Sequence, residues 1–153
     1  MMDVYNLPTS LCIGGVDCCI RTDFRAIIDI LRAFNDPDVI NAKMGVWVMI
    51  KILFEHPEQI PPDCIEEAIK KALEFIDGGF TVEEKTHPPK VMDWDKDAKL
   101  IMAAVNKVAG EDIRAQKYVH WWTFLSHYAE VGESTLTYII GIRQKKAKHE
   151  KLE

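Results

Sequence analysis

Asp93, Asp95 and Asp97 have the spacing of the first three ligands in a calcium-binding loop. Such a loop also requires a glycine at its sixth position and a bidentate glutamate at its twelfth. In this chain those positions are Ala98 and Ala104, so a calcium site is not expected. The three carboxylates are interpreted instead as charges that stabilise the N-terminus of a following helix.

The histidines and cysteines also lack the spacing of a metal site. His120 and His127 would lie two turns apart on one helix, and two imidazoles at that separation cannot bind one ion. The four cysteines form no paired C-x2-C pattern and are predicted to be free thiols: Cys12, Cys18, Cys19 and Cys64. No metal or cofactor is therefore expected.

Catalytic patterns are missing as well. Asp63 with Glu83 and Lys85 resembles an acidic nuclease pattern, but these residues fall on a predicted helix start and a loop rather than at one strand end. The chain contains no phosphate-binding loop, dinucleotide fingerprint, zinc-protease motif or nucleophile elbow. We therefore expect a protein that is not an enzyme, and no catalytic residue is assigned.

Aromatic residues give the one remaining functional signal. They are dense between positions 118 and 128, where most should belong to the core, but their number exceeds what one helix stripe can bury. This excess predicts a partner groove or an oligomer face, because aromatic residues are enriched at interfaces. The candidate interaction surface consists of Trp94, Tyr118, Trp121, Trp122, Phe124 and Tyr128.

Composition favours one soluble domain. The 153 residues are 48% hydrophobic, which is enough for a core without metal or disulfides, so a single domain over 1–153 is expected. The formal net charge is -5, and a nucleic-acid or membrane partner is not expected because both need a basic face. Residues 143–153 alone are basic, since five basic and two acidic side chains give +3. A nucleic-acid-binding module using this tail is the alternative reading.

Neither a membrane span nor a signal peptide is apparent. No apolar run approaches about 18 residues, and the first residues lack a basic segment followed by an apolar one. The protein is therefore expected in the cytoplasm.

The predicted fold begins with a β-hairpin at about 10–20. Gly14 and Gly15 supply the positive φ angles of a two-residue turn, and the resulting register places Cys18 in the core with Cys12 and Cys19 partly exposed. This hairpin must lie on the helices or pair with another chain, because an isolated hairpin is marginally stable.

Helical periodicity follows over the rest of the chain. Thr22 and Asp93 are predicted N-caps, whereas Gly78 and Gly110 are predicted helix stops. The segment 38–55 is apolar on more than one face; helix and strand both fit it, and its length favours a buried helix. The segment 78–92 is predicted to be a mobile loop. The predicted helices are about 22–34, 38–55, 61–77, 93–109, 112–130 and 133–148.

The fold class is therefore mainly α, a compact bundle of about six helices preceded by an N-terminal β-hairpin. Several blocks along nearly the whole chain also match a known family. They are Tyr5 to Ser10, the Ile13-Gly14-Gly15 turn, Ile20 to Arg25, Met92-Asp93-Trp94, Asn106 to Gly110, Ile113-Arg114-Ala115, His120 to Phe124, and Gly132-Glu133-Ser134.

With these blocks the chain resembles the phage tail protein family called gene product fifteen, from siphophages and prophages of Gram-positive bacteria. The resemblance implies a tail assembly chaperone that binds the tape measure protein and helps the tail tube protein to polymerise around it. A structural tail component is an alternative. No catalytic residue is defined for the family, and the need for many copies on one partner makes a homo-oligomer a further hypothesis.

Overall fold

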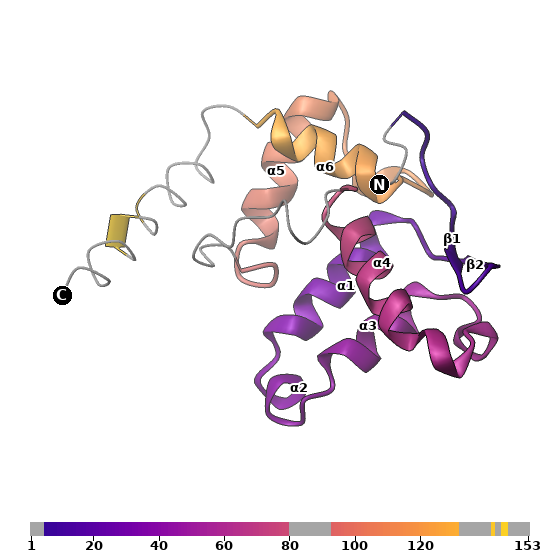
Figure 1. Ribbon diagram of the computed structural model, residues 1–153. Helices are drawn as coiled ribbons and strands as arrows, with labels where there is room; N and C mark the ends of the chain where they lie inside the picture. The colour runs from indigo at the N-terminus through magenta and orange to yellow at the C-terminus, as the bar shows by residue number, and fades with distance from the viewer. Residues whose placement is uncertain (1–4, 80–92, 132–141, 143–144, 147–153) are drawn as a thin grey trace. The chain divides into compact units, whose positions relative to one another are not determined.

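The computed structural model of the chain describes residues 5–79, 93–131, 142 and 145–146. In these residues a two-stranded antiparallel hairpin precedes six α-helices, so the predicted fold class is confirmed (Figure 1). The chain groups into two compact units. Met1–Lys85 and Tyr118–Trp122 form the first, and Thr86–Lys117 and Thr123–Glu153 form the second.

The hairpin forms as the paired glycines predict. Strands β1 (Ser10–Ile13) and β2 (Val16–Cys19) pair with Leu11 opposite Cys18 and Ile13 opposite Val16. Gly14 and Gly15 both have positive φ, at 58° and 81°, as a primed two-residue turn requires. Cys18 is buried while Cys12 and Cys19 are exposed, in agreement with the prediction, although Val16 beside the turn is exposed.

Both long sides of the hairpin are bonded to the helical part of the first unit. On the β2 side, the amide of Glu55 donates to the carbonyl of Cys19. On the β1 side, Lys71 Nζ donates to the carbonyl of Cys12, and Glu67 Oε2 accepts from the amide of Gly14. Glu67 and Lys71 also form an ion pair with each other at 3.0 Å, so the two side chains that bond to the hairpin are themselves paired.

Helix α1 (Phe24–Asn35) begins one residue later than the sequence indicates. Its N-cap is Asp23, whose side chain accepts from the amide of Arg25, so Thr22 is not the cap. Phe24, Ile27 and Ile30 are buried along its inner face. The helix ends at Asn35, since Asp36 is already the N-cap of the next helix and Pro37 is its first residue.

The single helix predicted over 38–55 is wrong. The structure has two short helices, α2 (Pro37–Asn41) and α3 (Gly45–Leu53), separated by three residues. The break occurs at Lys43, the non-glycine residue with positive φ in the described chain, at 56°.

Hydrogen bonds at the break explain why the sequence conceals it. The amide of Met44 donates to the carbonyl of Val39, and the amide of Lys43 donates to the carbonyl of Ile40. This is the Schellman ending of a helix, which normally has glycine at the position that Lys43 occupies. Without that glycine, the sequence gives no stop signal.

Helix α4 (Ile65–Ile76) follows two single 3-10 turns, Pro57–Gln59 and Pro62–Cys64, so the predicted helix 61–77 has a tighter first turn. Its end is the predicted one, with Gly78 in the left-handed region at φ 81°. The amide of Gly79 donates to the carbonyl of Glu74, and that of Gly78 to the carbonyl of Phe75. Both bonds belong to a second Schellman ending.

In the second unit, α5 (Ala98–Ala109) replaces the predicted helix 93–109, because its first turn is a hydrogen-bonded turn at 94–97. Asp93 Oδ1 accepts from the amides of Asp95 and Lys96, and these two bonds lower the pKa of the Asp93 carboxyl. The prediction that Asp93 is the N-cap of the helix is wrong, because the N-cap of α5 is Asp97 and Asp93 stabilises the preceding turn instead. Gly110, at φ 77°, ends α5 as predicted.

The helix predicted over 112–130 is wrong in its first half. Only a 3-10 turn forms at Ile113–Ala115, and α6 spans Trp121–Ala129. Asp112 caps the turn by accepting from the amide of Arg114, whose guanidinium also holds the pKa of Asp112 at about 2. Instead, the backbone of residues 118–121 forms hydrogen bonds with the start of α1. These bonds use N–H and C=O groups that a helix would need for its own hydrogen bonds.

Most of the predicted loop 78–92 and of the predicted helix 133–148 lies outside the described residues. Within the described ranges, no helix is both long and apolar enough to cross a membrane. The largest fully buried side chains of the first unit are Ile13, Ile27, Ile30, Met49, Leu53, Phe54, Phe75 and Trp121, and those of the second are Ile101, Val105 and Phe124.

Replacing Lys43 with glycine should stabilise the first unit. A left-handed conformation costs an L-residue roughly 1–2 kcal/mol, and glycine removes this cost. Part of the stabilisation is lost again, because glycine is more flexible in the unfolded chain and loses more entropy on folding. We expect a net increase of about 0.5–1 kcal/mol in the free energy of unfolding, measured by urea denaturation. Lys43→Ala is the control, because it removes the charge but keeps the Cβ. Equal stabilisation by both variants would contradict the backbone explanation.

Candidate interaction surface

The six aromatic residues of the predicted surface separate into buried and accessible groups. Trp121, Trp122 and Phe124 are buried, whereas Tyr118 is 54% exposed. Trp94 and Tyr128 are partly exposed. Contact of these residues with a partner stays a prediction, and three of them contribute to the interior of the units in which they lie.

Residues 118–122, which comprise a stretch at 118–120 outside any helix and the first two residues of α6, close the first unit. The amide of Phe24 donates to the carbonyl of Val119 at 2.9 Å, and the amide of Trp121 donates to the carbonyl of Thr22 at 2.7 Å. A β-bridge therefore joins Asp23 to His120 across 97 positions of sequence. We call residues 118–122 the closing segment.

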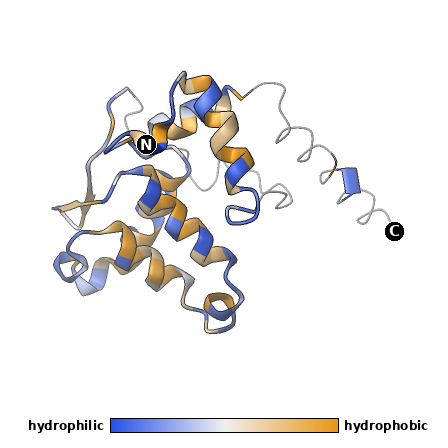
Figure 2. Ribbon diagram, turned by 180° about the vertical axis from the view of Figure 1, so that it is seen from behind, coloured by the Kyte–Doolittle hydropathy of each residue, from blue (hydrophilic) through white to orange (hydrophobic). Residues whose placement is uncertain are grey.

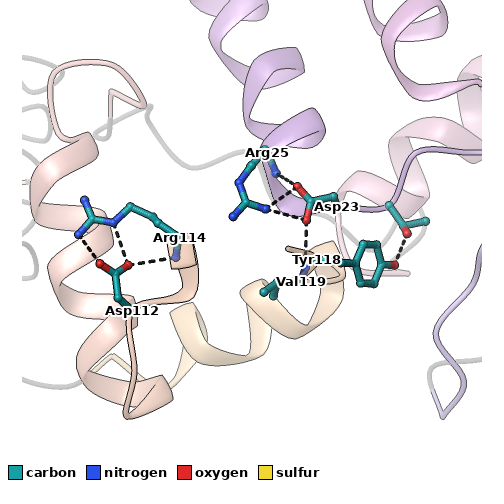
Figure 3. Close-up of polar contacts among 7 residues, drawn as sticks. Asp23, Arg25, Asp112, Arg114, Tyr118 and Val119 are labelled. Atoms are coloured by element: carbon teal, nitrogen blue, oxygen red, sulfur yellow. Dashed lines mark hydrogen bonds and ion pairs between the residues drawn. The ribbon is translucent and has the colours of Figure 1, made fainter. Parts of the chain in front are cut away.

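Asp23 is the polar centre of this junction (Figure 3). Its Oδ1 accepts from the amide of Val119 at 2.9 Å, while the same carboxylate caps α1 and pairs with Arg25 at 3.1 Å. The hydroxyl of Tyr118 is hydrogen-bonded to Thr22. One carboxylate thus starts α1 and fixes the closing segment beside it.

The two tryptophans of the closing segment bind the end of α4. Trp121 Nε1 donates to the carbonyl of Ile76, and Trp122 Nε1 donates to the carbonyl of Phe75, each at 2.8 Å. The last four carbonyls of a helix have no partner within it. Within the described residues, the Schellman ending leaves the carbonyl of Ile76 without a backbone donor, and the indole of Trp121 supplies a hydrogen bond to it.

His120 fastens the N-terminal segment to the same place. Its Nδ1 accepts from the amide of Trp122 at 3.0 Å, so Nε2 carries the proton and donates to the carbonyl of Pro8 at 2.8 Å. Burial lowers the pKa of the imidazole, which the bond to Pro8 opposes in part. His120 is therefore a neutral structural residue.

In the second unit, Trp94 packs on α6. Its ring centroid lies 6.3 Å from that of Phe124 and 6.3 Å from that of Tyr128. Burial raises the pKa of the Tyr128 hydroxyl, and the nearby carboxylate of Asp97 raises it further. These three aromatic residues hold the turn at 94–97 to α6, which accounts for most of their surface.

A different group of apolar side chains is exposed. Four of them lie within eight consecutive positions of α2, α3 and the break between these helices, and each is 40–56% exposed. Figure 2 shows hydrophobic colour on both helices. Sequence reasoning missed the group because it assigned the whole segment to a buried helix. We call it the corner patch: Ile40, Met44, Val46 and Trp47.

Large exposed apolar side chains that cluster in this way are typical of interaction sites, whereas single ones are ordinary. Lys43, in its left-handed conformation, lies inside the cluster, and strained backbone is enriched at functional sites. In the described part of the chain, no three His, Cys, Asp or Glu side chains gather as metal ligands would. The corner patch is thus the best candidate site, and its chemistry is that of protein contact.

Comparison with known proteins gives one match. A model of the family described as bacteriophage Gp15 protein matches residues 4–153, nearly the whole chain. No curated protein and no solved structure matches significantly.

The indole N–H groups of Trp121 and Trp122 should contribute differently to the free energy of unfolding. Trp121→Phe leaves the carbonyl of Ile76 buried and unpaired, which costs about 1–3 kcal/mol. Trp122→Phe should cost less through this effect, because the carbonyl of Phe75 keeps its bond from the amide of Gly78. Urea denaturation of the two variants measures the difference. A larger loss in Trp122→Phe would contradict this assignment.

Stability should depend on pH through His120. Its folded pKa is lower than the ordinary value of 6.5, so the unfolded chain binds the proton more readily. The free energy of unfolding should therefore be undiminished above pH 6.5 and fall as the pH decreases below it. Denaturation of the native chain and of His120→Gln between pH 7.5 and about 5 isolates this contribution. An equal slope in both proteins would contradict it.

Proposed function

The chain belongs to the bacteriophage Gp15 protein family, and on this basis we propose that it is a tail assembly chaperone that binds the tape measure protein. In this role it is not an enzyme and acts in the cytoplasm of the bacterial host. It keeps the tape measure protein dispersed until the tail tube protein polymerises around it. The resemblance of the whole chain to a tail protein family supports the role, and the corner patch supports the mode of binding.

The corner patch fits a helical partner. A long protein that is helical and exposed before assembly presents apolar stripes, and such a stripe binds an apolar surface through side chains at i, i+3, i+4 and i+7. Trp47 is the central contact, because tryptophan is the side chain most enriched at the points that dominate binding energy. It is 53% exposed, so its ring is available without unfolding α3.

The charge of the chain suits the same role. A net charge of -5 makes copies repel one another in solution away from their contact sites. An aggregation-prone partner covered by many such copies gains net charge, and net charge keeps proteins dispersed. The proposal therefore requires several chains on each tape measure protein rather than one.

Coexpression with the tape measure protein of the same phage tests the proposal. A tagged chain should bring the tape measure protein into the soluble fraction, with several chains in each complex as measured by light scattering. An insoluble tape measure protein beside a free chain would contradict the chaperone role.

Substitutions test the surface in the same experiment. Trp47→Lys should lower capture at least tenfold, since losing a central tryptophan costs about 2 kcal/mol or more. Val16→Lys is the control, because Val16 is also an exposed apolar residue of the first unit but lies on the hairpin. Capture that falls equally in both variants would exclude the corner patch as the specific site.

A further inference from the structure

We propose that the corner patch also binds the corner patch of a second copy, so that the free chaperone forms a weak, symmetric dimer that hides its own binding site. The meaning of this dimer as a resting state rests on the proposed function. The dimer itself does not depend on the proposed function, because its formation requires only the corner patch.

Charge at the edge of the patch is the first reason. Asp36 and Asp38 lie at the start of α2, Lys43 at the break, and Lys51 one turn after Trp47; all four are exposed. These are the only charged residues between positions 36 and 51, and they cancel, so the segment that carries the corner patch has no net charge although the whole chain carries -5. Two copies that repel one another elsewhere can approach here.

Both signs on one patch also suit a twofold contact. In a symmetric dimer the same surface meets itself, so it must carry its own complement. A surface selected for an acidic or a basic partner alone would carry one sign. Within the described residues, the side chains of Asp38, Lys43 and Lys51 form no ion pair. They are available to a second copy.

The exposed area sets the strength of the dimer. The exposed fractions of the four side chains amount together to about two complete side chains. At roughly 200 Å² for each large side chain, this is about 400 Å² per copy and about 800 Å² in a pair. Stable specific interfaces bury about 1,200–2,000 Å². The dimer should therefore be weak and in rapid exchange, and a partner with a longer apolar stripe can displace it.

Sedimentation equilibrium of the full chain tests the inference directly. Between about 10 µM and 1 mM, a range that covers dissociation constants typical of weak association, the weight-average mass should rise from one chain toward two. Trp47→Lys and Ile40→Lys should remain monomeric over the whole range, and Val16→Lys should associate like the native chain. Two patch variants are used so that misfolding of one, detected by circular dichroism, does not remove the test.

Three results would overturn the inference. They are a native chain that stays monomeric at the highest concentration, patch variants that associate as the native chain does, and a mass that rises beyond two chains, since a closed twofold contact stops at two. The test is separate from that of the proposed function. A dimer without tape measure capture would retain this inference and refute the chaperone role, and capture by a strictly monomeric chain would do the reverse.

Discussion

The hydrogen bond from the Trp121 indole to the carbonyl of Ile76 is the contact on which the first unit depends most. It satisfies the last carbonyl of α4 with a group from a segment 45 positions away. The same segment pairs with the start of α1 and holds the carbonyl of Pro8 through His120. The N-terminal segment, α1 and α4 therefore meet at five consecutive residues, and the first unit cannot form fully until the chain has reached position 122.

This constraint divides the aromatic residues by role. Trp121 and Trp122 are buried because their indole N–H groups have partners in the interior, while Trp47 lies half exposed on a short helix. Sequence density alone pointed to positions 118–128 as a surface. The structure places the clustered exposed apolar side chains at 40–47 instead, where two short helices meet at a strained turn.

The sequence predicted the features that depend on neighbouring residues. Gly14-Gly15 specified the hairpin and its register, and Gly78 and Gly110 ended α4 and α5. It could not predict the break at Lys43, because a lysine occupies the position where glycine is the signal. It also could not predict that residues 118–120 leave the helix, since the backbone partners of Val119 and Trp121 lie near position 23. The corner patch was missed for a related reason. Hydrophobic periodicity shows that a segment is apolar, but it does not show which of its side chains the rest of the fold leaves exposed.

We propose that the tape measure protein binds at the corner patch while the closing segment remains part of the core. Hydrogen–deuterium exchange of the chain, alone and in complex with the tape measure protein, tests it most directly. Amides of α2 and α3 should gain protection in the complex, whereas those of residues 118–122 should be protected in both states. Protection gained over 118–128 with no change in α2 and α3 would contradict the claim.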